Sequence, residues 1–296
     1  MPLLSTSMLG VIGGSGLYHL PELNVTDRRE IPTPYGLPSA AVTIGAIGGL
    51  DVAFLPRHGA GHAHTPTELP YQANIYALKQ LGVTHILSVS AVGSLREALP
   101  PLSIVLPDQI IDRSMLRPRS FFDNGAVAHV GLVDPFCGAL RDQVERATTG
   151  GSPTVVNGGC YLCIEGPQFS TRAESELYRS WGASVIGMTA MPEARLAREA
   201  ELCYATVAMV TDYDVWHETE AAVTVEMVVA NLRRNTEAAR RILVGLAETG
   251  LPARACACSS ALAGAIVTDP RHISLDTRRR LGIIAERYLG PTDLQA

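Results

Sequence analysis

The chain has 296 residues, 47% of them hydrophobic, and a formal net charge of −5. This composition supports a large buried core and excludes a disordered chain, and the acidic balance excludes the basic surface of a nucleic-acid-binding or membrane-surface protein. Because no apolar run approaches the roughly 18 residues of a membrane span and the first residues lack a signal-peptide pattern, we expect a cytoplasmic protein.

Two apolar strands near the N-terminus run into turns that can face an anion. The strand predicted at 8–12 leads into Gly13-Gly14-Ser15-Gly16, which either lets an anion approach its backbone amides or is a tight turn without a ligand. The segment 33–52 predicts a hairpin-like pair of strands, and the run at 52–56 ends in Arg57-His58-Gly59. Since Arg and His both donate to phosphate oxygens, that end is either an oxyanion clamp or a surface arginine beside a capping histidine.

The next segments alternate between helix and strand. Apolar residues at helical spacing predict a helix over 71–81, and the β-branched run 84–95 predicts a strand that ends in small and hydroxyl residues. A further strand is predicted at 104–111. The histidines of the turn at 62–66 lack a third ligand at metal spacing, so we expect them to be solvated or to face a substrate.

Two junctions between a strand and a helix follow. Strands predicted at 153–156 and 161–164 precede Phe169-Ser170-Thr171, whose hydroxyls are typical of a helix N-terminus. Phe169 either lies flat against a planar ligand or acts as an ordinary hydrophobic staple. The run 185–193 predicts another strand, turn and helix.

The run 205–217 is the most informative stretch, because it contains a predicted buried strand that ends in two carboxylates, Asp212 and Asp214. Ligands collect at the carboxyl ends of parallel strands. If the strand continues to Asp214, its period of two places both acids on the same side. The alternative is a strand that ends in a solvated acidic turn.

The remaining segments complete a single α/β domain. A helix is predicted over 221–246, a strand-like stretch at 265–267 and a final helix over 275–289. With no linker or repeat, the chain is predicted to form one domain over 1–296, with a central mixed, twisted β-sheet flanked by helices and with 253–296 as a helical extension packed on it.

The six cysteines predict buried thiols rather than a metal site. Cys160 and Cys163 form a CxxC and Cys256 and Cys258 a CxC, but no histidine array has zinc spacing. We therefore expect no metal.

Nine motifs in a fixed order are similar to those of a known family. They are GVIGGSGL, RHG, YQANIYALKQLG, SAVGSLRE, DQIIDRS, RPRSFFD, IEGPQFSTRAE, WGASVIGMTAMPEA and VTDYDVW. Together they resemble the 5′-methylthioadenosine phosphorylases, of the trimeric class of the purine nucleoside phosphorylase superfamily, over about residues 9–246. The resemblance implies a nucleoside phosphorylase-like fold and a pentosyltransferase of purine and methionine salvage that needs no cofactor.

The implied reaction is a reversible phosphorolysis. Inorganic phosphate, as co-substrate, converts 5′-methylthioadenosine, or a close 5′-deoxy or 5′-halo analogue, to adenine and a 5-substituted ribose 1-phosphate. When the functional residues of the family are transferred to the matching positions of this sequence, the phosphate site consists of Ser15, Arg57, His58, Ser90, the Ala91 amide and Thr189. The base and ribose site is Phe169, Ser170, Met188, Asp212 and Asp214, and the catalytic residues are Asp212, Asp214 and His58.

The base-recognising acid of the family corresponds to Asp212. Negative charge develops on the purine as the C–N bond breaks, and a protonated acid that donates to N7 stabilises this charge. Burial and the neighbouring Asp214 both raise a carboxyl pKa, so the two acids can share a proton. Relatives selective for 6-oxopurines place a neutral amide at this position, so Asp212 favours a 6-aminopurine. The alternative is a purine nucleoside phosphorylase for inosine or methylthioinosine.

The resemblance also implies a 5′-substituent pocket formed by His129, Val225, Val228 and Val229, partly from a neighbouring subunit. We therefore expect a homotrimer that binds small molecules and neither nucleic acid nor membrane. Methyl-sized discrimination is worth only about 1–3 kcal/mol, so the sequence does not fix the 5′-substituent.

Three kinds of departure from the family pattern occur. Gln168 stands where arginine is common, Pro70 where asparagine is common, and Ser15 and Ser90 where threonine is common. The serines keep the hydroxyl, so we expect phosphate binding to survive. The C-terminal CACSSAL segment resembles a microbial thermophile branch of the family, in which a CxC can form a disulfide.

Overall fold

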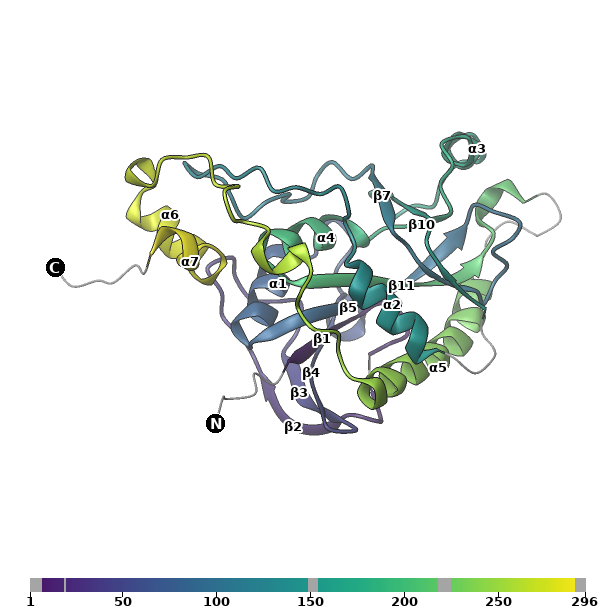
Figure 1. The fold of residues 1–296 in the computed structure, drawn as a ribbon. Helices are drawn as coiled ribbons and strands as arrows, with labels where there is room; N and C mark the ends of the chain where they lie inside the picture. Colours follow the sequence, from purple (N-terminus) through teal and green to yellow (C-terminus); the bar gives the residue numbers. More distant parts are fainter. Residues whose placement is uncertain (1–6, 19, 149–153, 218–224, 291–296) are drawn as a thin grey trace.

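The computed structural model describes residues 7–18, 20–148, 154–217 and 225–290, with the side chains of 225–230 outside the description. Figure 1 shows a large mixed β-sheet with helices on both faces, which confirms the predicted α/β class. Within this part of the chain, no helix combines the length and apolar character needed to cross a membrane.

The strands, in chain order, are β1 (Met8–Gly13), β2 (Asn24–Arg29), β3 (Val42–Ile47), β4 (Leu50–Pro56), β5 (Val83–Ser94), β6 (Ile104–Leu106), β7 (Gln109–Asp112), β8 (Val155–Asn157), β9 (Cys160–Cys163), β10 (Val185–Gly187) and β11 (Cys203–Asp212). The α-helices are α1 (Tyr71–Gln80), α2 (Gly138–Ala147), α3 (Arg172–Ser180), α4 (Ala190–Glu199), α5 (Val225–Thr249), α6 (Leu275–Leu281) and α7 (Glu286–Leu289). Short 3₁₀ helices are η1 (Ala60–His62), η2 (Asp214–Trp216), η3 (Ala257–Ser260), η4 (Pro270–His272) and η5 (Gly282–Ile284).

Strand β5 is the centre of the sheet. It pairs in parallel with β1 and with β11, and its last residues pair antiparallel with β10. The main path runs β2-β3-β4-β1-β5-β10-β9-β7, while β11 joins β5 to β6, and β6 pairs with β8. The carboxyl ends of β1, β5 and β11 therefore point the same way, and the turns that follow them gather at one edge of the sheet.

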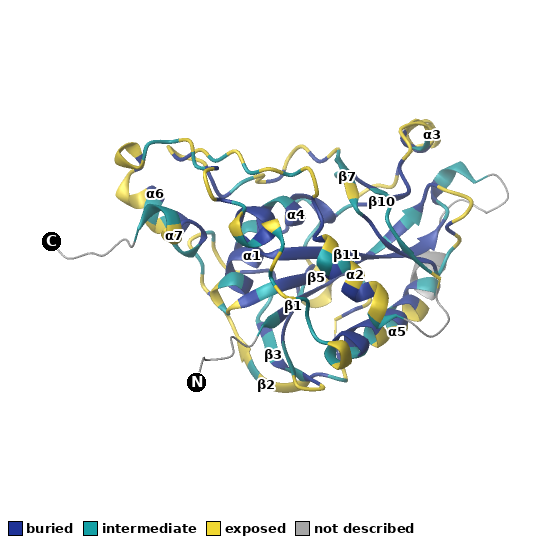
Figure 2. Ribbon diagram, in the orientation of Figure 1, coloured by how far each residue is buried: buried dark blue, intermediate teal, exposed yellow. Residues whose placement is uncertain are grey.

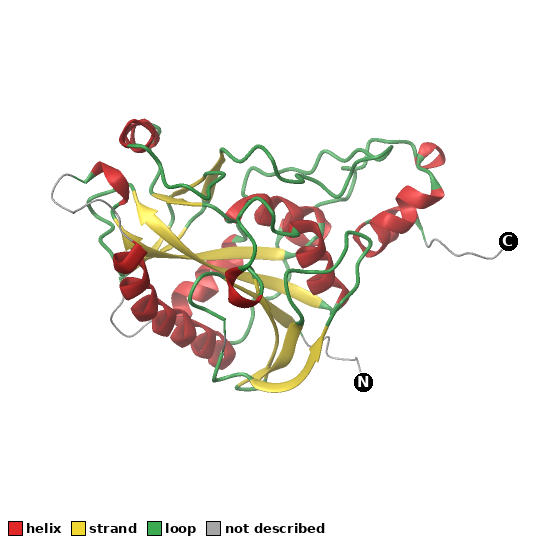
Figure 3. Ribbon diagram, turned by 180° about the vertical axis from the view of Figure 1, so that it is seen from behind, coloured by secondary structure: helices red, strands yellow, loops and turns green. Residues whose placement is uncertain are grey.

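Each face of the sheet has its own core, because the side chains of a strand alternate between the faces. On β11, Tyr204 and Ala208 belong to the cluster that includes α1 and α4, whereas Ala205 and Val207 belong to the cluster that includes α2 and α5. Figure 2 shows β1, β5 and β11 buried between these layers, and Figure 3 shows the long α5 from behind. The result is a three-layer sandwich whose central strands are largely buried.

The elements differ from the predicted ones where a local break was missed. The strand expected at 104–111 is two strands because Pro107 interrupts it, and the final helix is divided at Gly282, which has a φ of 45°. The stretch 265–267 forms only an isolated bridge between Ala128 and Ile266. Strand β2 was not predicted, because its polar residues lie at an exposed edge and have no core-facing pattern.

Candidate active site

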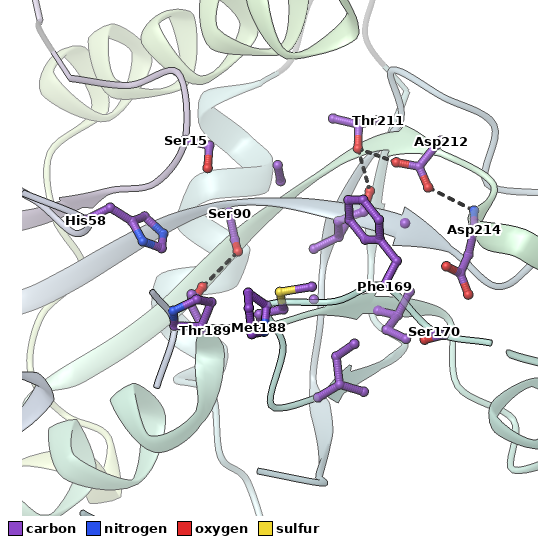
Figure 4. Close-up of a pocket in the computed structure, with 18 of the residues that line it drawn as sticks. Ser15, His58, Ser90, Phe169, Ser170, Met188, Thr189, Thr211, Asp212 and Asp214 are labelled. Atoms are coloured by element: carbon purple, nitrogen blue, oxygen red, sulfur yellow. Dashed lines mark hydrogen bonds between the residues drawn. The ribbon is translucent and has the colours of Figure 1, made fainter. Parts of the chain in front are cut away.

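The turns at this edge of the sheet surround one elongated cavity of about 260 Å³ (Figure 4). It is lined by Ser15, Arg57, His58, His62, Pro66, Ser90, Ala91, Val92, Gly93, Ile164, Pro167, Phe169, Ser170, Ile186, Gly187, Met188, Thr189, Thr211, Asp212 and Asp214. Every residue predicted for the phosphate, base and ribose sites is in this set. Residues from six separate strand ends and loops thus meet around one space.

Hydroxyl groups gather at one end of the cavity. The Oγ atom of Ser90, on β5, lies 3.2 Å from Oγ1 of Thr189 and 3.4 Å from the hydroxyl of Tyr161. Ser15 lies in the glycine turn after β1. A Cβ atom at Gly14 would lie 2.7 Å from Nη1 of Arg57, so only glycine lets the turn approach this closely. Small residues and hydroxyl donors here suit an oxyanion.

Arg57 is held in place by a buried ion pair that the sequence analysis did not predict. Its Nε atom donates to Oε1 of Glu193 at 2.5 Å, and Nη2 donates to Oε2 at 3.1 Å. Nη2 also donates to Ser88, and Nη1 donates to the Val89 carbonyl. Both side chains of the pair are 1% exposed. Since a guanidinium has five N–H groups, these contacts leave Arg57 about one N–H, on Nη1, for an anion.

His58 faces the cavity in its neutral form. Its Nδ1 lies 3.0 Å from the His64 carbonyl, an acceptor, so Nδ1 carries the proton and Nε2 is free to accept one. Burial and the charge of Arg57 lower the pKa of His58 to about 4. His62 stacks on this ring at 4.1 Å between centroids.

The opposite end of the cavity holds the acid pair. Thr211 donates to Oδ2 of Asp212 at 2.7 Å, and the backbone N–H of Asp214 donates to Oδ1 at 2.9 Å, as the dashed lines in Figure 4 show. Asp212 and Asp214 are only 6% and 8% exposed, so the solvated acidic turn considered above is wrong.

Both acids line the cavity, although the strand does not continue to Asp214 as the period-two prediction assumed. The strand ends at Asp212, and Asp214 adopts a left-handed φ of 50° at the start of η2 rather than continuing the strand. Ser175 of α3 donates to Oδ2 of Asp214 at 2.5 Å and holds this carboxyl in place. Burial raises the pKa of Asp214; the bond from Ser175 opposes this shift, and the charge of Asp212 adds to it.

Apolar and stacking groups separate the two polar ends. Phe169 is 50% exposed although it lines the cavity. Ser170 is 9% exposed, and its buried Oγ has no hydrogen-bond partner among the described residues. A Cβ at Gly166, whose φ is 69°, would lie 2.5 Å from Sδ of Met188. An accessible ring and an unpaired buried hydroxyl both suit a bound planar polar molecule.

A second buried arginine positions the loops around this middle section. Arg117 donates to the carbonyls of Met188 and Met191 at 2.6 Å each and pairs with Glu165 at 3.0 Å. Although burial alone would raise it, hydrogen bonds from Thr67, Met115 and Leu116 lower the pKa of Glu165 to about 2. Arg117 and Glu165 both lie in the motifs quoted above, but neither was assigned a role, because an arginine that joins the segments after β9 and β10 to its own loop has no local pattern.

The described part of the chain does not test the predicted 5′-substituent pocket. His129 is exposed and outside the cavity, with its backbone N–H donating to the Ala265 carbonyl. Val225, Val228 and Val229 fall in the first turns of α5, and their side chains lie outside the described residues. The role of all four stays a prediction.

Comparison with known proteins shows the family to which this chain belongs. A family model described as the phosphorylase superfamily matches residues 8–248, and the chain belongs to this family. Two curated relatives are more specific. The chain is 51% identical to a protein of Gloeobacter violaceus and 52% identical to one of Koribacter versatilis, both named S-methyl-5′-thioadenosine phosphorylase. The alignments cover 95% of this chain in both cases, and 95% and 97% of those proteins.

Solved structures agree with these relatives. A methylthioadenosine phosphorylase from an antarctic soil metagenomic library superposes with a TM-score of 0.86 at 46% identity, over 95% of this chain and 99% of that one. The methylthioadenosine phosphorylase of Schistosoma mansoni, solved in complex with adenine, gives 0.83 at 33% identity, over 88% and 99% of the two chains.

Removing the charge of Glu193 should destabilise the whole protein. Glu193→Gln leaves the Arg57 guanidinium buried without a counter-ion, which costs about 3–5 kcal/mol. Urea unfolding at fixed protein concentration measures this loss. The matched control is Glu22→Gln, because the ion pair of Glu22 with Arg240 is partly exposed, at 28% and 31%, and should contribute about 1 kcal/mol or less. Equal losses in the two variants would contradict the role of the buried pair.

The neutral state of His58 can be observed directly. Because its pKa is about 4, the ring should stay uncharged from pH 8 down to about pH 5 in the ligand-free protein. NMR titration of ring-labelled histidine, with His58→Asn to assign the signal, measures the midpoint. A midpoint near the ordinary value of about 6.5 would show that burial does not control this ring.

Proposed function

We propose that this protein catalyses the phosphorolysis of 5′-methylthioadenosine to adenine and 5-methylthioribose 1-phosphate. The observation that carries the proposal is the polarity of the cavity, which has hydroxyl donors and a histidine at one end, an acid pair at the other and stacking groups between them. Relatives near 50% identity that are named for this activity support it.

Phosphate occupies the hydroxyl end. Ser15, Ser90 and Thr189 supply O–H donors, the Ala91 amide lies on the same wall, and Arg57 supplies its remaining N–H. His58 has Nδ1–H committed to a carbonyl, so Nε2 accepts a proton as the anion binds. The nearby negative charge raises the pKa of the ring and stabilises the imidazolium. A phosphate oxygen is thereby held beside the sugar carbon that it attacks.

The base occupies the acid end. The phosphate oxygen forms a bond to C1′, the C1′–N9 bond breaks, and its electron pair passes to the purine ring. A carboxyl of the Asp212–Asp214 pair donates its proton to N7, which neutralises the leaving base. Burial raises the pKa of Asp214 and so favours a proton on this pair, and the ionised oxygens accept from the 6-amino group.

The sugar and its 5′-substituent lie between these ends. Met188 contacts the ribose, Phe169 stacks on the base, and the unpaired hydroxyl of Ser170 gains a partner in the base or sugar. His62 and Pro66 line the side towards which the 5′-group points, where His129 of a neighbouring subunit and the valines at 225, 228 and 229 complete an apolar pocket.

We also propose a homotrimer, and exposed apolar side chains near His129 support an interface between subunits. Met115, Leu116, Val127 and Val133 are exposed large apolar side chains in the loop between β7 and α2, the loop that also carries His129. Such a concentration of exposed apolar surface marks an interface. The six cysteines are free thiols, which favours a reducing compartment, the cytoplasm.

A panel of kcat/KM values tests the reaction and its selectivity. We expect phosphate-dependent adenine release to be fastest with 5′-methylthioadenosine, slower with adenosine, and at least roughly tenfold slower with inosine and methylthioinosine. Asp212→Asn should lower kcat/KM for 5′-methylthioadenosine by about 10²-fold or more and reduce the 6-oxopurine activity much less. Asp276→Asn, at a carboxylate 91% exposed, is the matched control and should change neither.

Two outcomes would reject the proposal. Preference for inosine would assign the protein to the 6-oxopurine phosphorylases, and absence of turnover with every nucleoside would leave a non-catalytic binding protein.

The interface is tested by the mass of the particle in solution. Light scattering should give about three times the chain mass of 31.5 kDa. Val133→Glu, at a side chain 82% exposed in this loop, should dissociate the assembly because it buries a charge in the interface. Val25→Glu, 50% exposed on the edge strand β2, should leave it intact. A monomeric wild-type protein, or two variants that behave alike, would refute the interface.

A further inference from the structure

Four of the six cysteines meet at the end of β11 that lies away from the acids. The Sγ atoms of Cys137, Cys203, Cys256 and Cys258 all lie within 4.8 Å of one another. Cys203 begins β11 and Asp212 ends it, so a rise of about 3.3 Å per residue puts the cluster about 30 Å from the acid pair. The cluster therefore belongs to no part of the candidate active site.

Three separate segments supply these sulfurs. Cys137 is the residue before α2, and its backbone N–H donates to the Tyr204 carbonyl at 2.7 Å, which places it beside the start of β11. Cys256 and Cys258 come from the segment that follows α5, 53 residues or more beyond Cys203. The fold, rather than any sequence spacing, brings the four together.

The sulfur–sulfur distances are close to those of a tetrahedral thiolate site. The Sγ of Cys256 lies 3.4 Å from that of Cys203 and 3.7 Å from that of Cys137. A metal with four bonds to sulfur of about 2.3 Å requires sulfur–sulfur edges of about 3.8 Å. The remaining sulfur pairs lie within 4.8 Å, so each differs from this edge length by about 1 Å or less.

The surroundings also fit a closed structural site. Cys137, Cys203 and Cys258 are 3%, 1% and 3% exposed, and they belong to the hydrophobic core on the α2 and α5 face. Cys256 is half-buried and gives access from solvent. All four are free thiols, which are weak hydrogen-bond donors, so mutual S–H contacts explain little of their convergence.

We propose that Cys137, Cys203, Cys256 and Cys258 form a structural site for one thiolate-preferring divalent metal ion, of which zinc is the best fit. Soft sulfur ligands in a closed tetrahedron select zinc over the harder divalent ions. On binding, each thiol releases a proton to solvent and the four thiolates bond the metal, so one M²⁺ is exchanged for four H⁺. The ion joins the segment after α5 to α2 and β11.

This inference departs from the expectation that the protein holds no metal. That expectation treated the CxC at 256–258 as an isolated pair, because Cys137 and Cys203 are distant in sequence.

Cobalt substitution of the reduced, full-length protein tests the site without a mutation. Anaerobic titration with Co²⁺ should give the intense visible bands of tetrahedral thiolate cobalt, saturate at about one ion per chain and release protons, and Zn²⁺ should then displace the cobalt. Cys256→Ser, at the half-buried ligand, should weaken these bands strongly. Cys160→Ser, the matched control on β9, should keep them. A weak spectrum of octahedral cobalt in the wild type, or bands that survive Cys256→Ser, overturns the proposal.

Two measurements on the wild-type protein complete the test. Metal analysis after purification without chelators should find about one zinc per chain, and its removal should lower Tm by several degrees. Alkylation of the denatured protein, prepared without added oxidant, should modify all four thiols after chelation. Recovery of these cysteines as disulfides instead would show that the cluster is a covalent cross-link and not a metal site.

Discussion

The parallel pairing of β5 with β11 is the constraint on which the site depends. In its register Ser90 lies opposite Ala208 and Gly93 opposite Asp212, so the hydroxyl end and the acid end of the cavity are separated by three residues of one rigid strand pair, about 10 Å. A slip by one residue would send each side chain to the other face of the sheet. Both strands are buried between two hydrophobic cores, and this burial fixes the register.

The polar groups beneath the cavity show how the protein keeps charges in a dry interior. Glu193 accepts from Arg57, Ser88 and Tyr204, so a carboxylate and a guanidinium that are both buried satisfy one another. Such a pair contributes little net stability but is costly to break. The role of the Arg57–Glu193 pair is to position Arg57, because it fixes the one remaining N–H of Arg57 beneath the glycine turn. The acid pair is different, since burial and the charge of Asp212 both raise the pKa of Asp214 and so favour a proton on the pair.

The fold class and most strands could be predicted from local patterns, whereas most residues around the cavity were predicted from the resemblance of nine motifs to a known family. Apolar runs gave β1, β5 and β11, and their polar ends gave Ser15, Ser90 and Asp212. The features that were not predicted depend on contacts between distant segments or on single residues that interrupt a helix or strand. Glu193 and Arg117 act across loops far apart in the chain, and Pro107 and Gly282 divide elements that the periodicity joined. The left-handed turn at Asp214 was also missed, because period-two geometry was extended past the strand.

The order of the strands in the sheet has a consequence for how the chain becomes active during synthesis. β5 lies between β1, made early, and β11, which begins more than a hundred residues later. Until the ribosome has passed Asp212, one edge of β5 has no partner and the anion end of the cavity has no acid end opposite it. Long-range pairing of this kind is slow and exposes apolar strand edges in the meantime. The edge of β5 that β11 covers is therefore paired late in synthesis, although it belongs to the strand that carries Ser90.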